Sequence, residues 1–103
     1  RADARLLALL AETRAAEADI AAVCRRNSDD ATLAAAQRRL EGLLSRMAET
    51  PAEGWEGIAA KAARICRSLR EGGMYQGGML PADGPVACSL ADDLARLAPE
   101  VVA

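Results

Sequence analysis

The stretch from Thr50 to Ile58 constrains the fold most, because it interrupts a sequence that otherwise favours unbroken helix. Proline disfavours a helical conformation of the residue before it, so a helix that arrives at Pro51 must end by Thr50. Thr50 at the N-cap, Pro51 at the first helical position and Glu53 at the third form a T-x-x-E capping box. We therefore predict that one helix ends at this point and another begins.

The residues on either side of this break predict an all-α fold. Ala, Leu, Arg and Glu dominate the chain, and these are strong helix formers. β-branched residues are scarce, and no run alternates between apolar and polar residues, so the sequence offers no strand. A length of 103 residues suits one domain, residues 1–103.

Four helices follow from the spacing of the apolar residues and the breaks between them. The predicted helices span about 3–26, 31–48, 51–71 and 86–98. The turn between the first two is short, which predicts an antiparallel hairpin. In this turn Asn27 suits the left-handed end of a helix, and a residue at 28–30 can cap the next one. The four helices form a small bundle.

The core of such a bundle is thin. Apolar residues make up 51% of the chain, but 25 of its residues are alanines, which bury little area. Pairing with a second copy would let the helices bury another face. Four leucines nearly encircle the start of the first helix: Leu6, Leu7, Leu9 and Leu10. They either form the seam of a homodimer or lie beneath the fourth helix of the same chain.

Two glycines flank the only tryptophan near the start of the third helix. Gly54 and Gly57 each cost roughly 1 kcal/mol relative to alanine inside a helix. Close approach of another backbone, with Trp55 filling the space beside it, would account for them. The alternative is an irregular first turn, and a bundle that holds an apolar ligand beside Trp55 is a further hypothesis.

The third helix carries a basic residue at every third position: Lys61, Arg64, Arg67 and Arg70. These residues spread over half of the helix circumference, toward the end where the macrodipole favours cations. We interpret them as a solvated surface, with the binding of an anion, nucleic acid or another polyanion as the alternative. The net charge of −2 and the mixed signs along the chain give no chain-wide signature for polyanions.

A Gly/Pro-rich loop at 72–85 separates the last two helices and is apolar for a linker. Its apolar residues include Met74, Tyr75, Met79 and Leu80. They either fold back over the end of the bundle or offer an adaptable contact to a protein partner. The loop matches no phosphate-binding pattern.

No catalytic or metal-binding chemistry is evident. The chain has no histidine, which removes the commonest general base and metal ligand. Its carboxylates are scattered, and three cysteines without histidine cannot complete an ordinary zinc site. Cys24, Cys66 and Cys88 lie in or beside apolar stripes and are expected to be buried. We therefore predict no catalytic residues, no metal and no cofactor, and a protein that is not an enzyme.

The cysteine spacing also bears on the compartment. Three widely separated cysteines do not resemble the framework of a disulfide-stapled secreted domain, which favours a reducing, cytoplasmic setting. No run of about 18 apolar residues suggests a membrane span.

Two segments share a pattern with known sequences. Residues 49–63 contain T-P-A-x-x-x-x-G-[LIV]-x-A-K-A, and residues 87–97 contain S-L-x-x-D-L. Together they resemble a loose set of small all-helical proteins from GC-rich proteobacteria, a set without an established function. The resemblance implies a bacterial protein in which the cap at Thr50, the contact at Gly57, Lys61 and the fourth helix belong to one scaffold. It implies no activity.

The sequence thus favours a non-enzymatic helical interaction module that self-associates, most simply as a homodimer. The candidate interaction residues are Leu6, Leu7, Leu10, Trp55, Met74, Tyr75 and Met79. The alternative is a small regulatory protein that binds nucleic acid or another polyanion through the four basic residues of the third helix.

Overall fold

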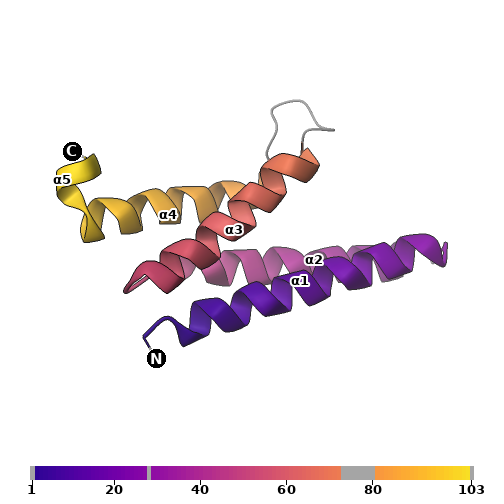
Figure 1. The fold of residues 1–103 in the computed structure, drawn as a ribbon. Helices are drawn as coiled ribbons and strands as arrows, with labels where there is room; N and C mark the ends of the chain where they lie inside the picture. Colours follow the sequence, from indigo (N-terminus) through magenta and orange to yellow (C-terminus); the bar gives the residue numbers. More distant parts are fainter. Residues whose placement is uncertain (1, 28, 73–80, 103) are drawn as a thin grey trace.

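The computed structural model describes residues 2–27, 29–72 and 81–102 (Figure 1). Its elements are α1 (Ala4–Arg25), α2 (Asp30–Glu49), α3 (Trp55–Gly72), the 3-10 helix η1 (Pro81–Asp83), α4 (Gly84–Leu97) and α5 (Pro99–Val102). This part of the chain holds no strand, and the all-α prediction is confirmed. The two hairpin helices end within one residue of their predicted limits. The short helix α5 was not predicted.

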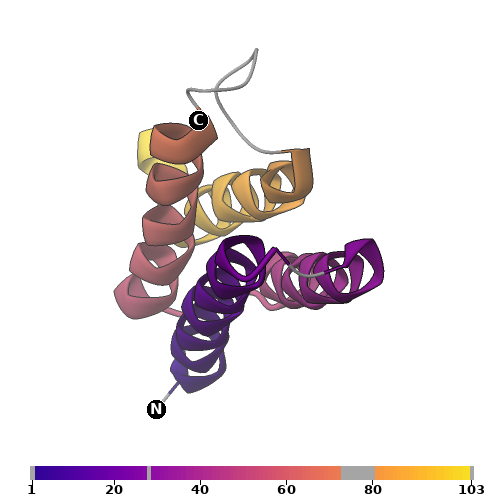
Figure 2. The ribbon, with the colours of Figure 1, turned by 90° about the vertical axis from the view of Figure 1, so that its right-hand side faces the viewer.

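The four long helices surround one core. α1 and α2 form the predicted antiparallel hairpin, with α3 against α1 and α4 against α2 (Figure 2). Because α3 and α4 also contact each other, each long helix lies mainly against two neighbours. The turn of the hairpin extends past the other helices (Figure 1). One contiguous core is formed by the buried residues Leu6, Leu9, Ala16, Leu43, Leu44, Met47, Ala52, Ile58, Ala60 and Val86.

The turn between α1 and α2 follows the sequence prediction. Asn27 has a positive φ of 52°, the left-handed conformation that ends a helix. Asp29 is the N-cap of α2, and its Oδ1 accepts a hydrogen bond of 2.7 Å from the backbone N–H of Thr32. Hydrogen bonding from the Thr32 side chain, and then from its backbone N–H, lowers the pKa of Asp29, because both stabilise the carboxylate.

The predicted capping box does not form. α3 begins at Trp55, and the Thr50 hydroxyl donates a hydrogen bond of 2.6 Å to the carbonyl of Arg46 in the helix before it. The backbone N–H of Glu53 donates instead to Oδ1 of Asp3, at 2.8 Å. A carboxylate is the stronger acceptor at a helix N-terminus, and Asp3 can reach it because the start of α1 and the end of α2 lie at the same open end of the hairpin.

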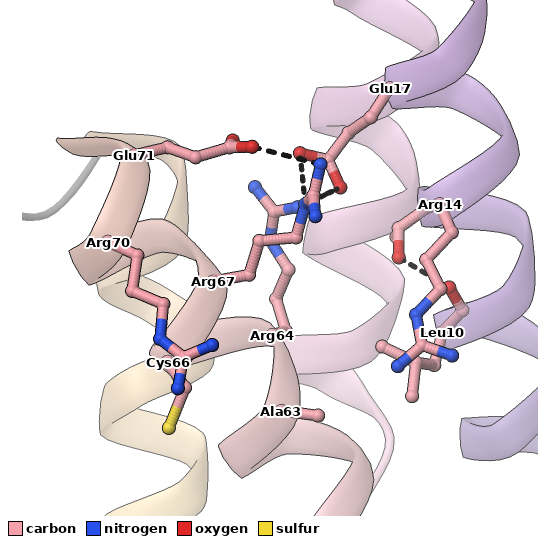
Figure 3. A pocket seen from close by; sticks show the side chains of 10 residues that line it. Leu10, Arg14, Glu17, Ala63, Arg64, Cys66, Arg67, Arg70 and Glu71 are labelled. Carbon is pink, nitrogen blue, oxygen red and sulfur yellow. Dashed lines mark hydrogen bonds and ion pairs between the residues drawn. The ribbon is translucent and has the colours of Figure 1, made fainter.

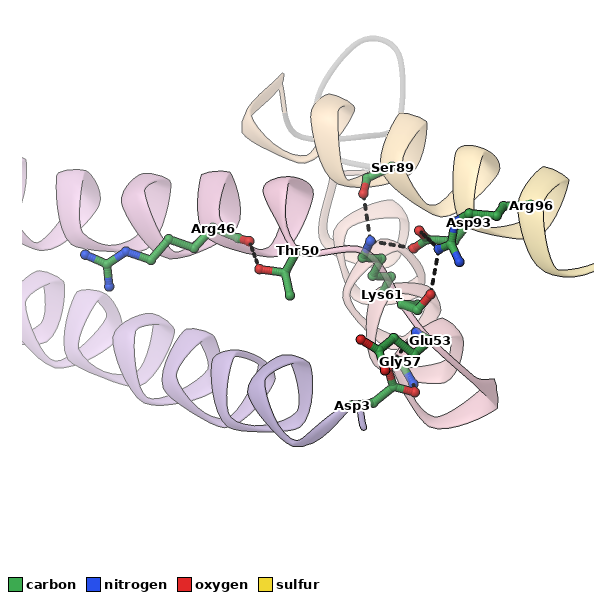
Figure 4. A network of polar contacts seen from close by, with 10 residues as sticks. Asp3, Arg46, Thr50, Glu53, Gly57, Lys61, Ser89, Asp93 and Arg96 are labelled. Carbon is green, nitrogen blue, oxygen red and sulfur yellow. Dashed lines mark hydrogen bonds and ion pairs between the residues drawn. The ribbon is translucent and has the colours of Figure 1, made fainter. Parts of the chain in front are cut away.

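Asp3 acts as a cap supplied from a distant part of the chain (Figure 4). Its Oδ2 accepts a hydrogen bond of 2.8 Å from the N–H of Gly57, in the first turn of α3. The hydrogen bond from Glu53 lowers the pKa of Asp3 most; burial opposes this, and hydrogen bonds from Gly57 and Gly54 add to it. Gly54 immediately precedes α3 and has no side chain with which to cap it, so Asp3 takes that role.

Gly57 leaves room for this carboxylate. A methyl group built there would lie 2.7 Å from Cγ of Asp3 and 2.8 Å from Cβ of Ala52. The predicted close approach is therefore real, but the approaching group is a side chain and not another backbone. Trp55 does not fill the space, because it faces solvent.

Candidate functional site

The basic residues of α3 do not form one surface. Lys61 and Arg64 turn into the bundle, with exposed fractions of 0% and 1%, whereas Arg67 and Arg70 are exposed. The interpretation of all four as a solvated surface is therefore wrong for the first two. An unpaired buried charge is strongly unfavourable, so the partners of these residues decide what they do.

Lys61 joins α3 to α4 (Figure 4). Its Nζ donates to Oγ of Ser89 at 2.7 Å and to Oδ2 of Asp93 at 2.5 Å. The other oxygen of Asp93 accepts from Nη2 of Arg96 at 2.9 Å, and the same nitrogen donates to the carbonyl of Ala52 at 2.6 Å. Lys61, Ser89 and Arg96 thus form a network around the buried carboxylate of Asp93. This network fixes α4 against α3 and the segment before it.

Arg64 ties α3 to α1 and η1. Its Nε and Nη2 donate to the two carboxylate oxygens of Asp83, at 2.7 and 3.0 Å. Its Nη1 lies 2.8 Å from Oε1 of Glu17, an ion pair that lacks hydrogen-bond alignment. Burial disfavours the charged guanidinium, but the hydrogen bonds to Asp83 and the negative charges of Asp83 and Glu17 outweigh it and raise the pKa of Arg64. Lys61 and Arg64 therefore stabilise the packing of α3 against its neighbours.

The leucine ring at the start of α1 is mostly covered within the chain. Leu6 and Leu9 are buried in the core, and Leu7 and Leu10 lie partly buried against it. The covering elements are mainly α2 and α3, not the fourth helix. The four leucines therefore leave little apolar surface of α1 exposed for the predicted contact with a second copy. The candidate residues Met74, Tyr75 and Met79, and with them the predicted contacts of the loop, lie outside the described residues.

An open apolar surface occurs instead where α3 begins and α4 ends. Trp55 is 76% exposed and lines a hollow of about 190 Å³. Apolar atoms of Ile58, Leu94 and Leu97 line the same hollow. We name Trp55, Ile58, Leu94 and Leu97 the Trp55 face. The Trp55 face is the first candidate for a functional surface, because Trp55 is its largest side chain and one of the predicted interaction residues.

A second candidate is a cleft between α1 and α3, of about 470 Å³ (Figure 3). Arg67 lies on it and binds both acidic residues nearby, Oε1 of Glu17 at 3.1 Å and Oε1 of Glu71 at 2.9 Å. Arg14 and Arg70 line the cleft too. Neither has a hydrogen-bond or ion-pair partner among the described residues. Three of the four predicted anion-binding residues, Arg64, Arg67 and Arg70, thus line the same cleft, and of these Arg67 and Arg70 are exposed.

The three cysteines contradict the expected burial. Cys24, Cys66 and Cys88 are all exposed free thiols. Each lies at the edge of an apolar stripe, and the spacing of the apolar residues alone does not show which of them lie at the buried centre of the stripe and which at its exposed edge.

Within residues 2–27, 29–72 and 81–102, no group of three or more His, Cys, Asp or Glu side chains could hold a metal ion. The helices of that part are all too short or too polar to cross a membrane.

Three aspartates accept the hydrogen bonds that join elements far apart in the sequence, and this role was not predicted from the sequence for any of them. Asp3, Asp83 and Asp93 are all buried. Only for Asp93 did the sequence contain an indication of its role. Lys61 and Asp93 belong to the two segments that carry the resemblance, and these segments meet at their ion pair.

Comparison of the chain with protein-family models, curated protein sequences and solved structures found no match. The resemblance therefore stays a prediction.

Proposed function

We propose that the chain is a non-enzymatic helical interaction module that pairs with a second copy of itself through the Trp55 face. The observation that carries this proposal is the exposure of Trp55 beside an apolar hollow. Exposed tryptophans that lie beside a hollow are typical of residues that dominate binding energy at protein interfaces. Among the other large apolar residues that the structure describes, Val101 alone is as exposed as Trp55, at 77%.

A second copy fits this surface because the face holds both a protruding side chain and a hollow. In a two-fold pair the same patch meets itself, so each patch must be complementary to itself. Trp55 of each copy would enter the hollow between Leu94 and Leu97 of the other. The hollow is lined by one charged residue, Glu53. Its charge lies at the end of a flexible side chain that can turn to solvent.

The area available supports weak pairing. Because Trp55 is 76% exposed, about 190 Å² of the roughly 250 Å² that a tryptophan can bury is open to a partner. At about 25 cal/mol per Å², two tryptophans would contribute about 10 kcal/mol. Association of two chains costs about 4–15 kcal/mol, so the tryptophans roughly offset it. Burial of Leu97, which is 41% exposed, would then supply the net favourable free energy of binding. We expect a dissociation constant on the order of micromolar to millimolar.

Sedimentation velocity tests the pairing. The natural chain should change from monomer to dimer as its concentration rises from about 1 µM to 1 mM, the range of the dissociation constant expected above. Trp55→Ala should stay monomeric over the same range. Leu69→Ala is the matched control, because Leu69 is 49% exposed on the same helix but about 21 Å further along it. Equal loss of dimer in both variants, or a monomer at every concentration, would contradict the proposal.

The alternative, binding of a polyanion through α3, has less support. Of its four residues, Lys61 and Arg64 are held in buried ion pairs. Only Arg67 and Arg70 remain at the surface. Retention on heparin at low salt that falls steeply as the salt concentration rises would support this alternative over self-association. An emission change of Trp55 on addition of a small apolar compound would instead support a ligand in the hollow.

A further inference from the structure

We propose that the cleft between α1 and α3 binds a small organic anion, with its negative group between Arg14 and Arg70 and its apolar body on Leu10 and Ala63. The proposal does not depend on pairing through the Trp55 face. That face lies at the start of α3, whereas the cleft follows the later turns of this helix. A result for one site therefore leaves the other unaffected.

The charges of the cleft show where an anion would bind. Four arginines and two glutamates line it, and Asp83 pairs with Arg64 from outside the lining, which gives a net charge of +1 (four positive, three negative). Arg64 is held by Asp83 and Glu17, and Arg67 by Glu17 and Glu71. Arg14 and Arg70 are the two arginines of the cleft that have no such partner among the described residues. A guanidinium without an internal partner keeps its donors free for a carboxylate or a phosphate.

The arrangement of the side chains defines the class of ligand. Figure 3 shows Arg70 beside Cys66 on the α3 side and Arg14 beside Leu10 on the α1 side, with Ala63 between them. A volume of about 470 Å³ lies within the usual range of small-molecule sites. Apolar atoms of Leu10 and Ala63 would contact carbon, and the two guanidinium groups would bind oxygen. A carboxylate with a small apolar body meets both requirements.

The exposed cysteines provide a built-in probe. Cys66 lines this cleft, whereas Cys88 lines a separate one beside Glu49 and Asp92. Each thiolate can displace iodide from iodoacetamide, which is neutral, or from iodoacetate, which is anionic. A carbon–sulfur bond forms, the carbon–iodine bond breaks, and the thiol proton goes to water. The ratio of the two rates reports the preference of each cleft for an anion.

Two double variants isolate these thiols: Cys24→Ser with Cys88→Ser leaves Cys66, and Cys24→Ser with Cys66→Ser leaves Cys88. At low salt we expect the iodoacetate-to-iodoacetamide ratio to be about three- to tenfold higher at Cys66, from unit charges acting through water at short range. Equal ratios at the two thiols would overturn the charge assignment. Circular dichroism confirms that each variant is folded.

Ligand protection tests binding itself. Sodium benzoate at millimolar concentration should slow the alkylation of Cys66 by iodoacetamide severalfold and leave Cys88 unaffected. Arg14→Gln with Arg70→Gln should abolish this protection, and Arg38→Gln, an exposed arginine on α2, should retain it. Absence of protection, or equal protection of both thiols, would overturn the proposal. Inorganic phosphate should protect less than benzoate; equal protection by phosphate would overturn the apolar part of the assignment.

Discussion

Replacing Gly57 by alanine should destabilise the chain, although alanine is the better helix former. The added methyl group would lie 2.7 Å from Cγ of Asp3 and 2.8 Å from Cβ of Ala52. Neither neighbour can move freely. Asp3 is held by the N–H of Glu53, and the carbonyl of Ala52 accepts a hydrogen bond of 2.6 Å from Arg96. The methyl group must therefore displace the cap or the segment before α3.

The magnitude follows from three contributions. Overpacking of this kind costs about 1–3 kcal/mol. The buried N–H of Gly57 loses its acceptor if the carboxylate moves, which costs about 1–3 kcal/mol more. Helix propensity returns about 1 kcal/mol. With middle values the free energy of unfolding falls by about 3 kcal/mol, and the melting temperature falls by roughly 12 °C or more for a domain of this size.

Thermal and urea denaturation followed by circular dichroism measure this change. Gly42→Ala is the matched control, because a methyl group at that position of α2 would meet no atom within 4 Å apart from its chain neighbours and the nearby backbone of its own helix. It should stabilise the chain by up to about 1 kcal/mol through helix propensity alone. If both substitutions stabilise the chain equally, the close approach of Asp3 to α3 does not exist and the reasoning is refuted.

Two further predictions concern the buried charges. Asp93→Ala leaves Lys61 buried without its anion and should lower the free energy of unfolding by about 3–5 kcal/mol. Adding Lys61→Met to the same chain should restore most of this loss. Urea denaturation measures both variants, and a loss below about 1 kcal/mol for Asp93→Ala would contradict the burial of the Lys61–Asp93 ion pair. The lowered pKa of Asp3 stabilises the fold above its ordinary value of 3.8, and this contribution is lost as the pH falls through the lower folded value. The urea midpoint of the natural chain should therefore fall more steeply below pH 4 than that of Asp3→Asn, and parallel curves would contradict the role of the cap.

The buried ion pairs and the Asp3 cap explain how a thin core gives a defined fold. Ala-rich helices can slide past one another, because small side chains interlock little. Lys61 with Asp93, Arg64 with Asp83, and Asp3 with the start of α3 each join elements that are far apart in the sequence. Each pair fixes one relative position of two elements. The positions of the Trp55 face and the α1–α3 cleft depend on these contacts.

The helices and the hairpin could be predicted from sequence because their signals are local. Asn27 and Asp29 act on residues within a few positions, and the breaks at proline and glycine depend on single residues. The capping box failed for the opposite reason. Its Thr50 and Glu53 have the right spacing, but Asp3 lies 50 residues from Glu53 in sequence and still reaches it. Local patterns contain no information on such a competitor.

The same limit applies to the candidate sites. Lys61 and Arg64 share a spacing with Arg67 and Arg70, but their acidic partners lie 32 and 19 residues away, so the spacing did not separate buried from exposed charges. The sequence predicted Trp55 both to fill the space beside the two glycines and to be an interaction residue; it is 76% exposed, whereas tryptophan is highly buried on average. Its exposure depends on where α4 ends, which the sequence of α3 does not determine. This departure from the average makes Trp55 a functional candidate.

The fluorescence emission of Trp55 reports on pairing through the Trp55 face without a label, because Trp55 is the only tryptophan in the chain. Pairing through the Trp55 face should move the indole from water into an apolar contact as the protein concentration rises. Its emission should then shift to shorter wavelength, and quenching by acrylamide should weaken, over the same concentrations at which the dimer forms. If a dimer forms while Trp55 keeps the emission and quenching of a solvated indole, the chain pairs through another surface and the account is wrong.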